Sequence, residues 1–322
     1  MAKIASYIAP KYGECSLGNA YEAFRLRCQA QNLSSGTCGW YDITVRCWNR
    51  FLEARDVTKA KEVTPTVIRA YLEDMRNRKL SSGYMCRTYG ALRCFFGFLA
   101  REQLIPQNPF ELVEKPRMEK KLIRPLSMDQ VRALLGAIDQ KLFPNHTAWT
   151  FMVLILDTGL RISEVIGLGN DQIDFSAGVL RVMGKGGKER EVPFGSTSKQ
   201  ALLNYMARRG EVPDQSLFFV NRYGGKLCRI WTQKTMRVVA KRIGIRGVRV
   251  SPHTLRHTFA INYVKNGGDA FSLQRILGHS SLDMVKIYVS LADQDVATMY
   301  RKFSPMDRIG LVPGAKRRVI VH

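Results

Sequence analysis

The chain has 322 residues, 45% of them hydrophobic, so it can bury a large core, and its length favours two domains over one. These values exclude an intrinsically disordered chain, a collagen-like chain and a disulfide-held mini-protein. Lys and Arg number 50 against 27 Asp and Glu, a formal net charge of +23, and this excess predicts a polyanionic partner, either nucleic acid or an anionic membrane surface.

Four segments of the first half have apolar residues at helical spacing, separated by short turns rich in Ser, Gly and Thr. They predict helices at residues 16–31, 39–55, 64–78 and 81–102. In the last of these, Arg87 and Arg93 fall outside the apolar stripe, so both are free to face a partner. We therefore expect a helical domain at residues 1–110 and a linker at 111–125, where prolines and charges replace the apolar pattern.

The pattern of the second half is mixed. Ser127 followed by Gln130 is a capping-box signature, which predicts a helix running to about residue 139. Further helices are expected at residues 147–158, 196–209, 230–242, 251–266, 272–277 and 293–301, and short strands at 173–175, 179–183 and 190–193. The predicted fold class is mainly α, with a mixed α+β domain at 126–303 that holds a small antiparallel sheet, and a tail at 304–322.

No stretch reaches the ~18 uninterrupted apolar residues that a membrane-spanning helix needs, and the first residues lack the apolar core of a signal peptide. The seven cysteines form no CxxC pair, so free thiols are expected in place of a disulfide framework or a zinc site. The sequence therefore predicts a cytoplasmic protein that has no membrane contact and binds no metal.

Two clusters in the second domain are suited to phosphate chemistry. Arg161 follows a Gly turn at the start of a new helix, where a guanidinium and unpaired N–H groups could bind a phosphate; the alternative is a surface pair with Glu164. Lys185 lies in Gly-Lys-Gly-Gly-Lys-Glu-Arg between two predicted strands, so it could reach into a groove or protonate a leaving oxygen. The alternative there is a solvated charged turn, and the spacing does not match a nucleotide-binding P-loop.

Three further clusters contain histidine or tyrosine. His253 and Arg256 share a helical face, which suits a scissile phosphate; a metal site through His253 and His257 is disfavoured because Thr254 stands where HExxH needs Glu. His279 follows a Gly at a helix end and could be only a cap. Tyr288 lies among apolar residues and could be only a core residue.

Taken in order, Arg161, Lys185, His253-x-x-Arg256, His279 and Tyr288 resemble the tyrosine recombinase (phage integrase) family. The resemblance covers about residues 126–300, and the helical first domain is similar to that family's core-binding domain. It implies that Tyr288 attacks a DNA phosphodiester, leaving a 3′-phosphotyrosyl link and a free 5′-hydroxyl. The two arginines would stabilise the phosphorane, His253 would assist proton transfer at Tyr288, Lys185 would protonate the 5′ oxygen, and His279 would bind a non-bridging oxygen. No metal, nucleotide or other cofactor is implied.

The resemblance also implies partners. These are double-stranded DNA with inverted-repeat core sites and three further copies of the chain, which exchange strands through a Holliday junction; an accessory DNA-bending protein stays an open question. Candidate DNA contacts are Arg46, Arg50, Arg87 and Arg93 in the first domain, and Lys188 and Arg190 in the second.

Several roles remain open. The helical unit starts near residue 16, which leaves no room for an arm-binding domain, and the long tail favours a mobile element over chromosome dimer resolution. Two alternatives have a different activity: a catalytically inactive DNA-binding accessory protein, and an enzyme like a type IB topoisomerase or telomere resolvase. The accessory protein would form no product, whereas the enzyme would form relaxed circles or hairpin ends instead of recombinants.

Overall fold

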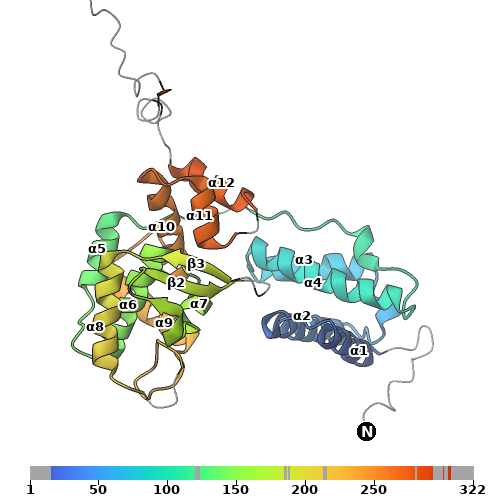
Figure 1. Ribbon diagram of the computed structural model, residues 1–322. Coiled ribbons are helices and arrows are strands. Elements are labelled where there is room, and N and C mark those ends of the chain that lie inside the picture. The colour runs from blue at the N-terminus through green and yellow to red at the C-terminus, as the bar shows by residue number, and fades with distance from the viewer. Residues whose placement is uncertain are drawn as a thin grey trace, which may run out of the picture. The chain divides into compact units, whose positions relative to one another are not determined.

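The chain forms two compact units, residues 1–121 and 122–322. The computed structural model describes residues 16–119, 124–184, 187, 189–212, 216–279, 281–292, 300 and 304–305 (Figure 1). Within these residues no helix is both long enough and apolar enough to cross a lipid bilayer. The mainly helical fold class with one small antiparallel sheet is confirmed.

The first unit contains the four helices that the sequence predicts. They are α1 (Leu17–Ala30), α2 (Ser35–Glu53), α3 (Pro65–Asn77) and α4 (Ser82–Arg101), with short 3-10 segments at Ala60–Glu62 and Pro109–Leu112. Each helix begins after a Ser or Thr whose side-chain oxygen accepts a backbone N–H of the first turn, namely Ser16, Ser34, Thr64 and Ser81. Helix α2 starts four residues earlier than expected, because the Ser34 cap outweighs the helix-weakening Gly36 and Gly39.

Aromatic side chains hold these helices together. Trp48 of α2 is fully buried, and its ring centroid lies 4.9 Å from that of Tyr71 in α3 and 6.1 Å from that of Phe96 in α4. Such edge-on pairs add to the free energy of burying the rings themselves. The first unit therefore has its own core and presents its charged side chains outward.

The segment after α4 is attached to that helix. The buried Tyr89 hydroxyl lies 2.8 Å from the carbonyl oxygen of Phe110 and 2.6 Å from that of Val113, and the Ser82 hydroxyl accepts the N–H of Glu119. The Cys86 thiol is 2.9 Å from the carbonyl oxygen of Pro116. Residues 110–119, most of them in the predicted linker, are thus fixed to the first unit by specific side chains.

The second unit is built around α6 (Phe143–Thr158), which is buried on almost every side and packs against α8 (Ser196–Arg209) and α10 (Pro252–Lys265). The sheet has the order β1 (Ile173–Asp174), β2 (Val179–Met183), β3 (Glu189–Pro193), and both pairings are antiparallel. The remaining helices are α5 (Met128–Gly136), α7 (Ile162–Ile166), α9 (Arg229–Arg242), α11 (Ala270–Leu277) and α12 (Asp283–Ala292), with a 3-10 turn at Asn170–Gln172.

Predictions for several helices of this unit need correction. The Ser127–Gln130 capping box forms as expected, but α5 ends at Gly136, three residues early. Helix α6 begins four residues before Thr147, because Pro144 is compatible with a first helical turn. Helix α12, which contains Tyr288, was not expected, and the helix predicted at 293–301 lies outside the described residues except for Tyr300.

Candidate active site

Arg161 lies where α6 ends and α7 begins. Gly159 ends α6 in the left-handed conformation, with φ of 64°, which turns the chain so that Arg161 can cap α7. The Glu164 carboxylate accepts the backbone N–H of Arg161 at 2.8 Å and its Nη1 at 2.8 Å. The Arg161 side chain is still 35% exposed while that of Glu164 is 6% exposed, so the ion pair and an accessible guanidinium coexist.

Arg256 of α10 is almost completely buried, and none of the ion pairs between described residues includes it. Its Nη1 donates to the carbonyl oxygen of Gly159 at 2.6 Å and its Nη2 to that of Leu277 at 2.8 Å. Burial, with the charge of Arg161, lowers its pKa to about 10, so the guanidinium stays protonated at neutral pH. A fixed, desolvated cation of this kind is what a phosphorane transition state requires.

His279 follows the C-terminus of α11 and contacts Arg256. Nη2 of Arg256 lies 2.9 Å from Nε2 of His279. Since an arginine can only donate, Nε2 must accept and the ring proton is on Nδ1. Nδ1 is buried and has no hydrogen-bond partner among the described residues, which leaves one donor unused in this state.

Tyr288 of α12 lies between two histidine rings and is 3% exposed. Its ring centroid is 5.3 Å from that of His257 and 6.3 Å from that of His279, and His257 in turn lies 4.7 Å from His253. Burial raises the pKa of the Tyr288 phenol, whereas the charges of Arg256 and Arg161 act in the opposite direction. The structure therefore brings Tyr288 together with both arginines and all three of these histidines.

The three histidines are neutral at pH 7. Burial and the charge of Arg256 lower the pKa of His253, while burial, first of all, lowers those of His257 and His279 to about 4. A neutral imidazole can accept a proton, so His253 can serve as a base. The sequence analysis gave His257 no role, although its spacing of four residues from His253 already put the two on one helical face.

Two family descriptions match the chain. The phage integrase family matches residues 124–295, and the N-terminal SAM-like domain of phage integrases matches residues 27–103. The chain belongs to the tyrosine recombinase family. It is a tyrosine site-specific recombinase.

Relatives of the recombinase cover most of its length. The tyrosine recombinase XerC of Pelobacter propionicus is 33% identical over 293 residues, which are 89% of this chain and 95% of the relative. XerC of Anoxybacillus flavithermus is 30% identical over 282 residues, 85% and 93% of the two chains, and XerD of Halalkalibacterium halodurans is 32% identical over 254 residues, 78% and 85%.

Solved structures share the fold of the recombinase. A lambda integrase dimer bound to a COC′ core site has a TM-score of 0.72 at 18% identity, covering 87% of this chain and 98% of that one. The Tn1549 transposon integrase in complex with transposon right end DNA has a TM-score of 0.71 at 19% identity, covering 92% and 100%. At these identities the likeness concerns the fold.

Two predicted site residues lie in the loop between β2 and β3, and a third, Arg190, lies in β3. Lys185 and Lys188 lie outside the described residues, so their roles stay predictions. Arg190, predicted to contact DNA, has a largely buried side chain whose Nη1 and Nη2 each donate to Glu164 at 3.0 Å. Its Nε donates to the carbonyl oxygen of Ile276 at 2.9 Å. All three nitrogen atoms of this guanidinium group therefore form hydrogen bonds within the protein.

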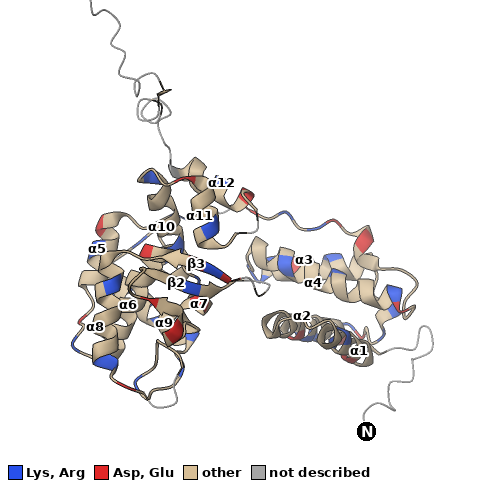
Figure 2. Ribbon diagram, in the orientation of Figure 1, with Lys and Arg blue, Asp and Glu red and all other residues tan. Residues whose placement is uncertain are grey.

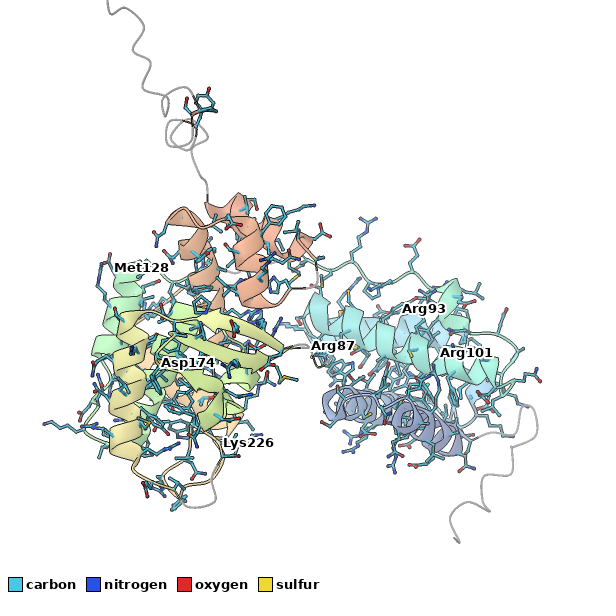
Figure 3. The ribbon with its side chains drawn as sticks, in the orientation of Figure 1. Arg87, Arg93, Arg101, Met128, Asp174 and Lys226 are labelled. Carbon is cyan, nitrogen blue, oxygen red and sulfur yellow. The ribbon has the colours of Figure 1, made fainter. Side chains whose placement is uncertain are left out.

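The four predicted DNA contacts of the first unit are all exposed. Arg46 and Arg50 lie on α2, and Arg87 and Arg93, labelled in Figure 3, lie on α4. The Arg87 guanidinium is 4.1 Å from the ring centroid of Trp40, a cation–π contact that fixes its direction. Lys and Arg lie on both units (Figure 2), which agrees with a polyanionic partner.

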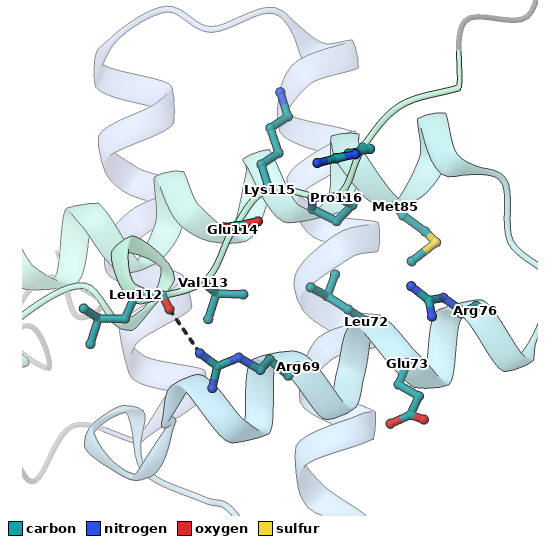
Figure 4. Close-up of a pocket in the computed structure, with 11 residues that line it drawn as sticks. Arg69, Leu72, Glu73, Arg76, Met85, Leu112, Val113, Glu114, Lys115 and Pro116 are labelled. Carbon is teal, nitrogen blue, oxygen red and sulfur yellow. Dashed lines mark hydrogen bonds between the residues drawn. The ribbon is translucent and has the colours of Figure 1, made fainter.

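The first unit also contains a hollow of about 660 Å³ (Figure 4). Arg69 of α3 spans one side of it and donates to the carbonyl oxygen of Leu112 at 3.3 Å. Its lining includes none of the predicted catalytic residues. In the part of the chain that the structure describes, no three His, Cys, Asp or Glu side chains form a group that could hold a metal ion.

Proposed function

We propose that the recombinase cleaves one DNA strand at a specific site, with the Tyr288 hydroxyl as the nucleophile. The new bond joins the phenol oxygen to phosphorus, and the bond from phosphorus to the 5′ oxygen breaks. The phenol gives its proton to a base, and the departing 5′ oxygen takes one up from an acid. The observation that supports this most is the convergence of Tyr288, Arg161 and Arg256 in one unit, with His253, His257 and His279 beside them.

The residue roles proposed here are those that the family resemblance implies, and the grouping of the two arginines and the histidines around Tyr288 supports the roles of the described residues. Arg161 and Arg256 stabilise the charge that develops on the phosphorane, and loss of one such donor costs about 10²–10³ in rate, or about 3–4 kcal/mol. Because burial raises the pKa of Tyr288, the phenol needs a base when it attacks, and neutral His253 fills that role. His279 binds a non-bridging oxygen, and Lys185 protonates the leaving 5′ oxygen.

We further propose that four copies act on two DNA sites, each with inverted repeats, and pass through a Holliday junction. The phosphotyrosyl bond conserves the energy of the broken phosphodiester, so no nucleotide is consumed. Support comes from the lambda integrase dimer on its core site and from the XerH recombinase bound to a palindromic difH substrate. Integration and excision of a mobile element is the proposed role. The second candidate role, chromosome dimer resolution, is supported by the likeness to XerC and XerD.

DNA binding is expected to depend strongly on salt. The net charge of +23 and the exposed arginines of α2 and α4 support contacts with about eight phosphates per protomer. The logarithm of the association constant should then fall by about seven for each tenfold rise in salt concentration. A nearly flat dependence, measured by fluorescence anisotropy with duplex DNA, would contradict the proposal.

A nicked suicide substrate tests the cleavage step. DNA flanking the native gene is incubated with the protein, and a covalent adduct is detected by denaturing electrophoresis. The adduct should form with the wild type and with Tyr223→Phe, an exposed tyrosine that serves as the matched control, and should be lost in Tyr288→Phe.

The same assay separates the alternatives. No adduct with the wild type on any flanking sequence favours a DNA-binding accessory protein. An adduct that resolves into relaxed circles or hairpin ends favours a topoisomerase or telomere resolvase activity.

A further inference from the structure

Arg190 of β3 connects two structural elements that carry candidate catalytic residues. Its side chain is 13% exposed, and all three of its nitrogen atoms donate hydrogen bonds within the protein. Two of these bonds go to Glu164 of α7 and one goes to the last turn of α11, which packs against β3 (Figure 1).

Glu164 forms ion pairs with both Arg190 and Arg161. Arg190 donates to both oxygens of this carboxylate at 3.0 Å, and Arg161 donates its Nη1 to Oε1 and its backbone N–H to Oε2, each at 2.8 Å. Burial acts to raise the pKa of Glu164, but the two guanidiniums more than offset it, so the pKa lies below its usual value. Glu164 therefore stays charged, and its position depends on both arginines.

The bond to α11 fixes the end of that helix. Nε of Arg190 donates to the carbonyl oxygen of Ile276, and Gly278 two residues later lies directly against the guanidinium. A Cβ at Gly278 would be 3.0 Å from Cζ and Nε of Arg190. The carbonyl oxygen of Gly278 accepts Nη2 of Arg161 at 3.2 Å, and His279 follows at once.

We infer that Arg190 is a positioning residue for strand cleavage: it locks Glu164, and through it Arg161, against the helix end that presents His279. The inference rests on the proposed function. It replaces a direct DNA contact as the role of Arg190, because a phosphate could bind this guanidinium only by displacing Glu164, whose side chain is 6% exposed.

The planar fork of arginine is needed for this role. Only a guanidinium can bond both carboxylate oxygens and a carbonyl on a third side at once, whereas a lysine presents one point charge. Without Arg190, Glu164 has one cationic partner, Arg161, and this pair is no longer tied to β3. A misplacement of about 1 Å at a reacting centre costs about 100-fold in rate.

Two variants, Arg190→Gln and Arg190→Lys, test the inference in the full-length protein. The matched control is Arg181→Gln on the neighbouring strand β2, where Arg181 forms an exposed pair with Glu191 at 3.8 Å. Two quantities are measured with the suicide substrate: the rate of adduct formation at saturating protein, and the dissociation constant for DNA as a function of salt. Circular dichroism establishes the temperature range in which each variant is folded.

We expect adduct formation to slow by about 100-fold in Arg190→Gln and about 10-fold in Arg190→Lys, with DNA affinity and its salt dependence unchanged. Arg181→Gln should match the wild type in both quantities. If Arg190→Gln does not fold, Arg190→Lys alone decides, and a wild-type cleavage rate in either variant overturns the inference.

A different result would restore the DNA-contact role. Weaker binding, a salt slope reduced by about one, and an unchanged rate at saturation are what a lost phosphate contact produces, and they overturn the positioning role. A wild type that forms no adduct overturns the proposed function and this inference together, whereas a wild type that cleaves while Arg190→Gln cleaves equally well overturns the inference alone.

Discussion

Replacing Gly159 by alanine should damage both stability and cleavage. Gly159 has φ of 64°, and a Cβ built there would lie 2.4 Å from Cδ1 of Phe259 and 2.7 Å from Cδ2 of Leu277. Neither neighbour is a flexible surface chain, because both belong to the core packed around α10 and α11. The left-handed conformation costs an alanine about 1 kcal/mol, and the overpacking adds about 1–3 kcal/mol.

Gly244 offers a matched control. It has φ of 71° just after α9, and a Cβ there would meet nothing within 4 Å. Gly244→Ala should therefore lower the free energy of unfolding by the backbone cost alone, about 1 kcal/mol, whereas Gly159→Ala should lower it by about 2–4 kcal/mol. Urea unfolding followed by circular dichroism measures both values.

Cleavage provides a second readout. The carbonyl oxygens of Gly159 and Leu277 hold the Arg256 guanidinium, so displacement of either moves a candidate catalytic charge. Gly159→Ala should slow adduct formation at temperatures where it is fully folded, and Gly244→Ala should not. Equal losses of stability in the two variants, or a wild-type cleavage rate in Gly159→Ala, would refute the reasoning.

Two further predictions concern stability. Tyr89→Phe should cost about 1–2 kcal/mol, because it removes the hydroxyl that lies within hydrogen-bond distance of the carbonyl oxygens of Phe110 and Val113; faster trypsin cleavage after Arg117 would show that the segment has been released, and an unchanged rate would contradict this. Stability should also fall as the pH drops below about 6.5, since all four described histidines have folded-state pKa values below that of the unfolded chain, so the unfolded state binds more protons. For His257 and His279 the loss of stability continues to about pH 4 and amounts to at most about 1.4 kcal/mol per pH unit for each histidine, less because both are partly exposed. Urea unfolding at several pH values measures this loss. A free energy of unfolding that stays constant between pH 7 and about pH 5 would argue against buried neutral imidazoles.

The sequence alone was sufficient for what depends on near neighbours in the chain. Helix starts such as Ser81 and Ser127 were predictable, because a cap bonds N–H groups only two or three residues away. The order of Arg161, His253-x-x-Arg256, His279 and Tyr288 likewise identified the family, since a spacing of residue types is itself sequence information. Helix α12 was not predicted although Val285 and Tyr288 are buried at helical spacing, because the exposed apolar residues Met284, Ile287 and Val289 obscure the amphipathic period.

Only the tertiary structure decided which groups bind one another. Arg190 was a plausible DNA contact as long as it was one of many cations, but its partners are Glu164 and Ile276, 26 and 86 positions away. Arg256 is bonded to Gly159, 97 positions earlier. The sign of a side chain's charge can be read from the sequence, but its neighbours in space cannot. Whether it faces DNA or a buried carboxylate depends on the packing of helices and strands that are distant in the chain.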